Sequence, residues 1–305
     1  MKISRRLLSL IAALVFAIAG LGLVWSSGFT VYVELMRFGS ATPNTIAPTL
    51  GLVLGGLLFA AAAATVAISS LGALVVGGIF TITGLLGVLP SIGGMEPFSI
   101  VGFRFFLGTS DGLSSGITIA LACGVVLVVG LILLVAGLVV HGRRRGSGRG
   151  SLVARLTSVL ALPLVLCGLY LVSSGGGILY SQYVQRMSYA WEPMPLLQVL
   201  AGAVLFAVAA VSLRWTALGV GVAGAVLFLL GLLGLLLSRD LLAVISDAGV
   251  PGPAMNGIIS LMVTGQYLLI AGALLGAAVG SKIAASRAAR AHETRLDAPA
   301  PAPVV

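Results

Sequence analysis

The chain has 305 residues, of which 59% are hydrophobic and only 8% are charged. A soluble domain typically carries about 25% charged residues, so this composition excludes a soluble globular protein and indicates a lipid bilayer as the solvent. The formal net charge of +9 would suggest nucleic-acid binding in a soluble chain. In a membrane protein, basic residues gather in cytoplasmic loops instead, so we expect membrane lipid and no nucleic acid as a partner.

Eight apolar stretches follow one another along the chain, and none has a charged residue in its central part. Each is long enough, or nearly so, to cross about 30 Å of hydrocarbon as a helix. Lipid offers no hydrogen-bond partners to the backbone, so helices are expected and the fold class is an all-α polytopic membrane protein. The eight predicted transmembrane helices cover residues 7–25, 49–68, 71–89, 116–140, 156–174, 196–213, 216–237 and 257–279.

Two pairs of these stretches are almost continuous in sequence. Only Ser69 and Ser70 separate the second from the third, and only Arg214 and Trp215 separate the sixth from the seventh. A single helix across either pair would far exceed the thickness of the bilayer, so each pair is predicted to form a tight hairpin.

An internal duplication underlies this pattern. Residues 49–89 align without gaps on residues 196–236, at a constant offset of 147 (196 minus 49), and the matches include Gly77 with Gly224. Gly- and Leu-rich helices share matches by chance, so the unbroken register is the stronger argument. It predicts two parallel four-helix repeats, which enter the membrane from the same side because four is an even number.

The duplication divides the chain into four parts. Residues 1–141 form the first four-helix membrane half and residues 152–281 form the second. A basic, Gly/Ser-rich connector joins them at 142–151 and is expected in the cytoplasm. Residues 282–305 are charged and then rich in Ala and Pro, which predicts a disordered cytoplasmic tail.

Basic residues predict the orientation. With both termini inside, only Arg37, Arg104, Arg186 and Arg239 of the 17 Lys and Arg residues lie outside, as the positive-inside rule requires. The N-terminal stretch also resembles a signal peptide. The duplication requires a counterpart of the fifth helix there, so we expect it to be retained. The Arg-, Gly- and Ala-rich composition is typical of GC-rich bacteria, and the predicted location is the plasma (inner) membrane of a bacterium, crossed several times.

Few residues suggest chemistry. No acidic residue lies in a predicted span, whereas proton- or ion-coupled transporters usually place ionisable groups there. His141 and His292 are interpreted as solvated surface histidines, and Cys123 and Cys167 lie in apolar runs without metal-ligand spacing. The Gly-rich segments lack the Lys-Ser/Thr ending of a phosphate-binding loop. We therefore expect no catalytic residues, no cofactor and no metal.

Two segments are candidates for contacts. Gly272, Gly276 and Gly280 recur every four residues, which places them on one helix face where backbones approach closely. This face serves either packing within the chain or self-association and binding of a protein partner. Tyrosines and other interfacial side chains predict a short outer helix at headgroup level, either an ordinary aromatic belt or a partner site. Its candidate residues are Tyr180, Tyr183, Met187 and Trp191.

Three functions remain open. The first is a non-enzymatic scaffold or accessory subunit acting through helix packing and outer-loop contacts. The second is a transporter or permease for an uncharged or apolar solute, with its pathway between the two halves. The third is a lipid-modifying membrane enzyme that uses outer carboxylates. The missing intramembrane charges favour the first, and a polar cavity between the halves would favour the second.

Overall fold

A computed structural model of the chain describes residues 2–38, 42–89, 111–143, 151–186, 193–237, 244, 247 and 249–296. These residues form helices and short turns. The helices are α1 (Lys2–Phe38), α2 (Ile46–Ala64), α3 (Ser70–Val88), α5 (Asp111–Ala122), α6 (Val125–Arg143), α7 (Ser151–Arg186), α8 (Pro193–Val211), α9 (Leu218–Leu236), α11 (Gly252–Val263) and α12 (Gln266–Leu296). Three 3₁₀ turns, η1 (Pro43–Thr45), η2 (Thr65–Ala67) and η3 (Ser212–Arg214), lie beside α2 and α8.

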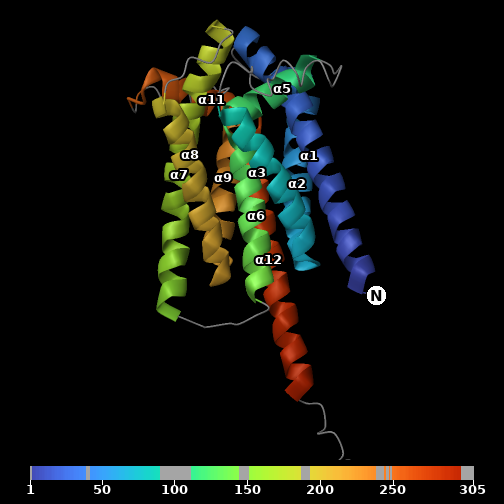
Figure 1. The fold of residues 1–305 in the computed structure, drawn as a ribbon. Helices are drawn as coiled ribbons and strands as arrows, with labels where there is room; N and C mark the ends of the chain where they lie inside the picture. The colour runs from blue at the N-terminus through green and yellow to red at the C-terminus, as the bar shows by residue number, and fades with distance from the viewer. Residues whose placement is uncertain are drawn as a thin grey trace, which may run out of the picture.

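Eight helical spans in the described part of the chain are long and apolar enough to cross a membrane. The prediction of an all-helical, multi-pass membrane protein is thereby confirmed. The long helices form one bundle, with the N-terminus, the start of α7 and the far end of α12 together at one end (Figure 1). We call this the terminal end of the bundle. The short helices α5 and α11 lie at the opposite end, which we call the loop end (Figure 1).

Two predicted helices are broken in the structure. The sequence predicted one continuous helix over 116–140 and another over 257–279, but the first is divided between α5 and α6 and the second between α11 and α12. Gly124 (φ +72°) and Gly265 (φ +73°) interrupt them in the left-handed region, which glycine adopts without steric cost. Apolar patterning missed both breaks because glycine is common throughout these helices.

The helices joined by tight turns diverge. As predicted, α2 and α3 are separate helices with a short turn between them, and so are α8 and α9. However, α2 packs mainly against α1 and α12, whereas α3 packs mainly against α6. Likewise α8 packs mainly against α7, and α9 against α12. The two helices joined by each tight turn therefore pack mainly against other helices rather than side by side, as the predicted hairpins would.

The expected disorder from Lys282 onward is wrong as far as Leu296, because α12 continues to that residue. The extension is rich in Ala and Arg, which are strong helix formers. It is also tied to the bundle, since Arg287 Nη1 donates a hydrogen bond to the Ala67 carbonyl oxygen at 3.0 Å. Residues 297–305, most of the connector (144–150) and the loop at 90–110 lie outside the described residues.

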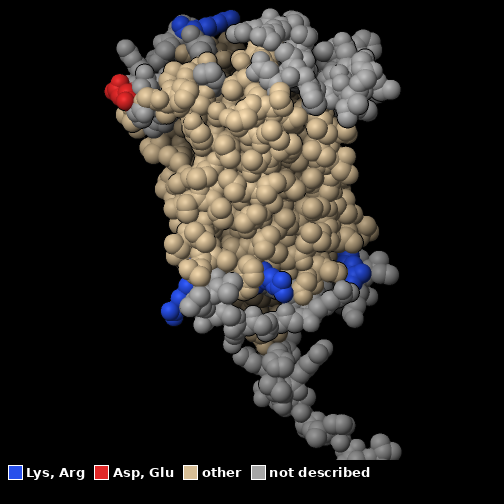
Figure 2. Space-filling view, turned by 60° about the vertical axis from the view of Figure 1, so that its left-hand side comes forward, with Lys and Arg blue, Asp and Glu red and all other residues tan. Residues whose placement is uncertain are grey.

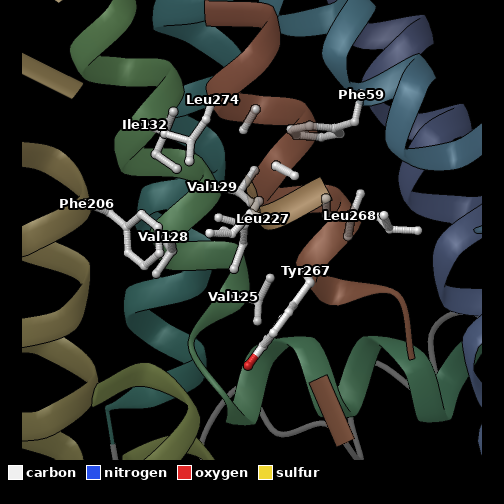
Figure 3. Packing of buried hydrophobic residues seen from close by; sticks show 14 of the residues in the cluster. Phe59, Val125, Val128, Val129, Ile132, Phe206, Leu227, Tyr267, Leu268 and Leu274 are labelled. Atoms are coloured by element: carbon white, nitrogen blue, oxygen red, sulfur yellow. The ribbon is translucent and has the colours of Figure 1, made fainter. Parts of the chain in front are cut away.

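The centre of the bundle is filled by apolar side chains from most of the long helices. Figure 3 shows part of this cluster, including Val129 and Ile132 of α6 and Leu268 and Leu274 of α12. All four side chains are almost completely buried. The surface between the two ends carries a broad uncharged band, and basic side chains lie around the rim of the terminal end (Figure 2).

Candidate functional site

The predicted glycine face of α12 packs inside the chain, against α2. A Cβ atom added at Gly272 would lie 3.3 Å from the backbone nitrogen of Ala60. One added at Gly276 would lie 2.7 Å from the Ala63 Cβ, and one at Gly280 would meet the end of the same helix. The structure thus uses this face for an intramolecular contact in which two helix backbones approach directly.

The predicted aromatic segment is the end of a long helix. Tyr180 and Tyr183 belong to the last turns of α7, which runs unbroken from Ser151, so these turns are not a separate interfacial helix. Tyr180 is half-buried and packs against the central cluster. Met187 and Trp191 lie outside the described residues.

The first helix break is enclosed by α7 and α8. Cys123 precedes Gly124 at the break, and its buried Sγ donates a weak hydrogen bond to the Gly176 carbonyl oxygen at 3.5 Å. A Cβ added at Gly176 would lie 2.7 Å from the Cys123 Cα, and one added at Gly124 would meet Val199 of α8. The α5–α6 break is therefore held by helices that come later in the chain.

The second helix break is enclosed in the same manner by α1 and α2. Gly28 of α1 faces the backbone of Thr264, since a Cβ atom added at Gly28 would lie 3.1 Å from the Thr264 Cα. One added at Gly265 would lie 2.7 Å from Leu52 Cδ2 of α2. Thr264 Oγ1 donates to the Ser260 carbonyl oxygen at 2.6 Å, which satisfies its own hydroxyl within α11. The two breaks thus couple the early helices to the late ones.

Two residues with buried polar groups border a small apolar cavity beside these breaks. Gln266, the first residue of α12, is fully buried, and neither its amide nitrogen nor its amide oxygen has a hydrogen-bond partner among the described residues. The indole nitrogen of Trp25 in α1 is likewise buried and unpaired. Both residues line a cavity of about 10 Å³ between α1, α3, α5, α6 and α12. The other lining side chains are apolar, and only apolar atoms are exposed to the cavity, so it offers no hydrogen-bond partner to a water molecule.

A second buried polar contact joins α7 to α12. The hydroxyl groups of Ser173 and Tyr267 lie 3.2 Å apart in the interior, and both side chains are almost completely buried. Figure 3 shows the Tyr267 ring extending from α12, with its hydroxyl pointing away from the labelled apolar side chains. A buried phenol normally finds such a partner, so we interpret this pair as a packing contact between helices.

At the terminal end, polar contacts converge on the turn between α2 and α3. Ser9 Oγ of α1 donates to the Ser69 carbonyl oxygen at 3.3 Å. Ser70 Oγ lies 3.4 Å from Nδ1 of His141, the exposed histidine near the end of α6. Side chains from three helices therefore contact this turn: Ser9 from α1, His141 from α6 and Arg287 from α12.

The described residues contain no group of three or more His, Cys, Asp or Glu side chains close enough to hold a metal ion. Sequence reasoning did not indicate that Gln266 and Trp25 border the same cavity, because the two residues are far apart in the sequence and no local pattern relates them. No family model matches the chain, and no curated protein or solved structure matches it either.

Proposed function

We propose that this multi-pass membrane protein is a non-enzymatic scaffold or accessory subunit, which acts through helix packing and through contacts at its loop end. The observation that carries the proposal is the close packing where early and late helices meet. There the α12 backbone lies directly on α2, and the neighbouring cavity measures about 10 Å³. Ligand pockets typically measure about 300–1,000 Å³. A junction filled in this way suits a protein that holds helices and loops in fixed positions.

We further infer that the chain consists of two parallel four-helix repeats. The lengths of corresponding helices support this, with 37 and 36 residues in α1 and α7, and 12 each in α5 and α11. Helices α2, α3, α8 and α9 each have 19 residues. The aligned glycines also have corresponding neighbours, since Gly77 meets Leu134 of α6 and Gly224 meets Leu275 of α12.

The two inferred repeats interlock, which favours a rigid assembly. The last helix of the first repeat, α6, packs against α8 of the second as well as against α3. The last helix of the second repeat, α12, packs against α2 of the first as well as against α9. Separating the two repeats would break both the packing of α6 against α8 and the glycine contacts of α12 with α2. This arrangement supports a scaffold more than a transporter whose halves rock against each other.

The proposed location is the plasma membrane of a bacterium, with both termini in the cytoplasm. The distribution of exposed basic residues supports this orientation through the positive-inside rule. At the terminal end they are Arg6, Arg155, Arg214, Lys282, Arg287 and Arg290. Among the described residues at the loop end, the exposed basic residue is Arg37, near the end of α1.

Photo-crosslinking from the loop end tests the scaffold proposal. A photoreactive amino acid at Val244, which is 67% exposed between α9 and α11, should give a discrete protein adduct in native membranes. The matched control is Val208, a valine that is 49% exposed on the lipid-facing side of α8 and should label lipid only. Only lipid adducts from both positions, across the growth conditions of the host, would refute contacts at this face.

A permease for a small uncharged solute is the second candidate, and the buried polar groups of Gln266 and Trp25, which have no hydrogen-bond partner among the described residues, favour it. Gln266 and Trp25 line a cavity between helices of the two inferred repeats, which is where a solute pathway is expected. Proteoliposomes should then take up glycerol or urea faster than protein-free vesicles, and Gln266→Leu should abolish the difference. Such a result would replace the scaffold proposal. Equal rates with and without protein would remove the permease.

A further inference from the structure

The turn between α8 and α9 places a basic side chain on an aromatic one at the terminal end. The guanidinium carbon of Arg214 lies 5.9 Å from the centroid of the Trp215 ring. Arg214 is exposed and Trp215 is half-buried. Tryptophan is favoured at the boundary between hydrocarbon and headgroups, and the turn lies between two apolar spans, Pro193–Arg214 and Leu218–Leu236. The pair is thus at headgroup level.

A second cation lies at this turn, supplied by α12. This helix runs antiparallel to α9, since a Cβ at Gly224 would lie 3.0 Å from Leu275 and one at Gly221 would lie 3.6 Å from Ala278. Lys282 follows Leu275 by seven residues, two helical turns, and so lies on the same face. Continuing the antiparallel register brings exposed Lys282 beside the first residues of α9, and α12 also contacts η3.

Apolar side chains flank these cations on the membrane side. Leu218 is 70% exposed at the start of α9, and Val211 and Ile283 are 38% and 39% exposed on the adjoining helices. A free phosphate ion would interact with the basic groups alone. A surface that combines two cations, an indole and exposed aliphatic side chains fits a molecule with an anionic head and a hydrocarbon tail.

We propose that Arg214, Trp215 and Lys282 bind the phosphate headgroup of an anionic phospholipid whose acyl chain lies along Val211 and Leu218. The corresponding turn between α2 and α3 carries Ala67 and Ile68 in place of Arg214 and Trp215. The basic residue near that turn, Arg287, donates to a backbone carbonyl there. Among the described residues no second turn carries this combination of side chains, and the site does not depend on whether the protein is a scaffold or a permease.

Native mass spectrometry of the purified full chain, titrated with phosphatidylglycerol or phosphatidylcholine, tests the site. Phosphatidylglycerol should bind more tightly, and Arg214→Gln combined with Lys282→Gln should weaken that binding by at least about tenfold. Each basic residue near an anionic lipid contributes roughly fivefold. Arg6→Gln combined with Arg290→Gln removes two exposed cations from the same end and should change the affinity less than about twofold.

Three further measurements complete the experiment. The charge-conserving pair Arg214→Lys and Lys282→Arg should retain most of the binding, and thermal unfolding in phosphatidylcholine should be alike for all variants. Equal loss in both Gln pairs would overturn the proposal, because binding would then follow overall charge. Inorganic phosphate that stabilises the protein in phosphatidylcholine as strongly as phosphatidylglycerol does would also overturn it, because the site would take a free ion.

Discussion

Replacing Gly276 by alanine probes the contact between α12 and α2. The added Cβ would lie 2.7 Å from the Ala63 Cβ and would also press on the Ala60 carbonyl oxygen. Backbone atoms and a Cβ have no rotamer through which to move away, so the helices themselves must separate. Overpacking of this kind costs about 1–3 kcal/mol. Gly22→Ala is the matched control, because a Cβ at Gly22 in α1 has no neighbouring atom within 4 Å.

Thermal unfolding of the purified protein, followed by tryptophan fluorescence, gives the comparison. The melting temperature should fall for Gly276→Ala, by roughly 2–4 °C per kcal/mol for a chain of this size class. It should be unchanged or slightly higher for Gly22→Ala, since alanine is favoured over glycine within a helix by up to about 1 kcal/mol. Equal melting temperatures for the two variants would refute the packing argument. A changed oligomeric state for Gly276→Ala alone would show that the face also mediates self-association.

Three other predictions concern the breaks, the cysteines and the topology. Gly124→Ala and Gly265→Ala should each lower the melting temperature, because a left-handed conformation costs a non-glycine residue about 1–2 kcal/mol; wild-type stability of either variant would contradict the described break. Both Cys123, which is buried, and Cys167, which lies near the middle of an apolar span, should react slowly with a maleimide in the membrane because only the thiolate reacts, and unfolding in detergent should expose both; rapid labelling of Cys123 before unfolding would count against its burial. A reporter fused after residue 146 should read as cytoplasmic in bacterial cells, and a periplasmic reading would reverse the proposed orientation.

Some features of the fold follow from local properties of the sequence. The eight apolar spans were predictable because the free energy of placing a segment in lipid depends chiefly on its own length and hydrophobicity. The two tight turns were predictable for a related reason, since a helix continuous through Ser69 or Arg214 would exceed the bilayer. The four-residue spacing of Gly272, Gly276 and Gly280 likewise indicated a close-packing face before any partner was known.

The partners of these segments were decided by the tertiary structure. In a chain with 42 glycines, nothing local distinguishes Gly124 and Gly265, which break helices, from the many glycines within helices. The later helices α7 and α8 enclose the first break and the earlier helices α1 and α2 enclose the second, so the cause of each break lies far away in the chain. Helicity beyond Lys282 also has a tertiary component, because Arg287 reaches the end of α2.

Composition and charge by themselves determined that this chain spans a membrane several times, and they predicted which end faces the cytoplasm. Only the tertiary structure placed α12 on α2 and brought Trp25 and Gln266 to the border of one cavity. The physical reason is that insertion into lipid is a property of each helix alone. Association between helices in lipid depends on the shapes and polar groups of both surfaces, and a single segment contains only one of them.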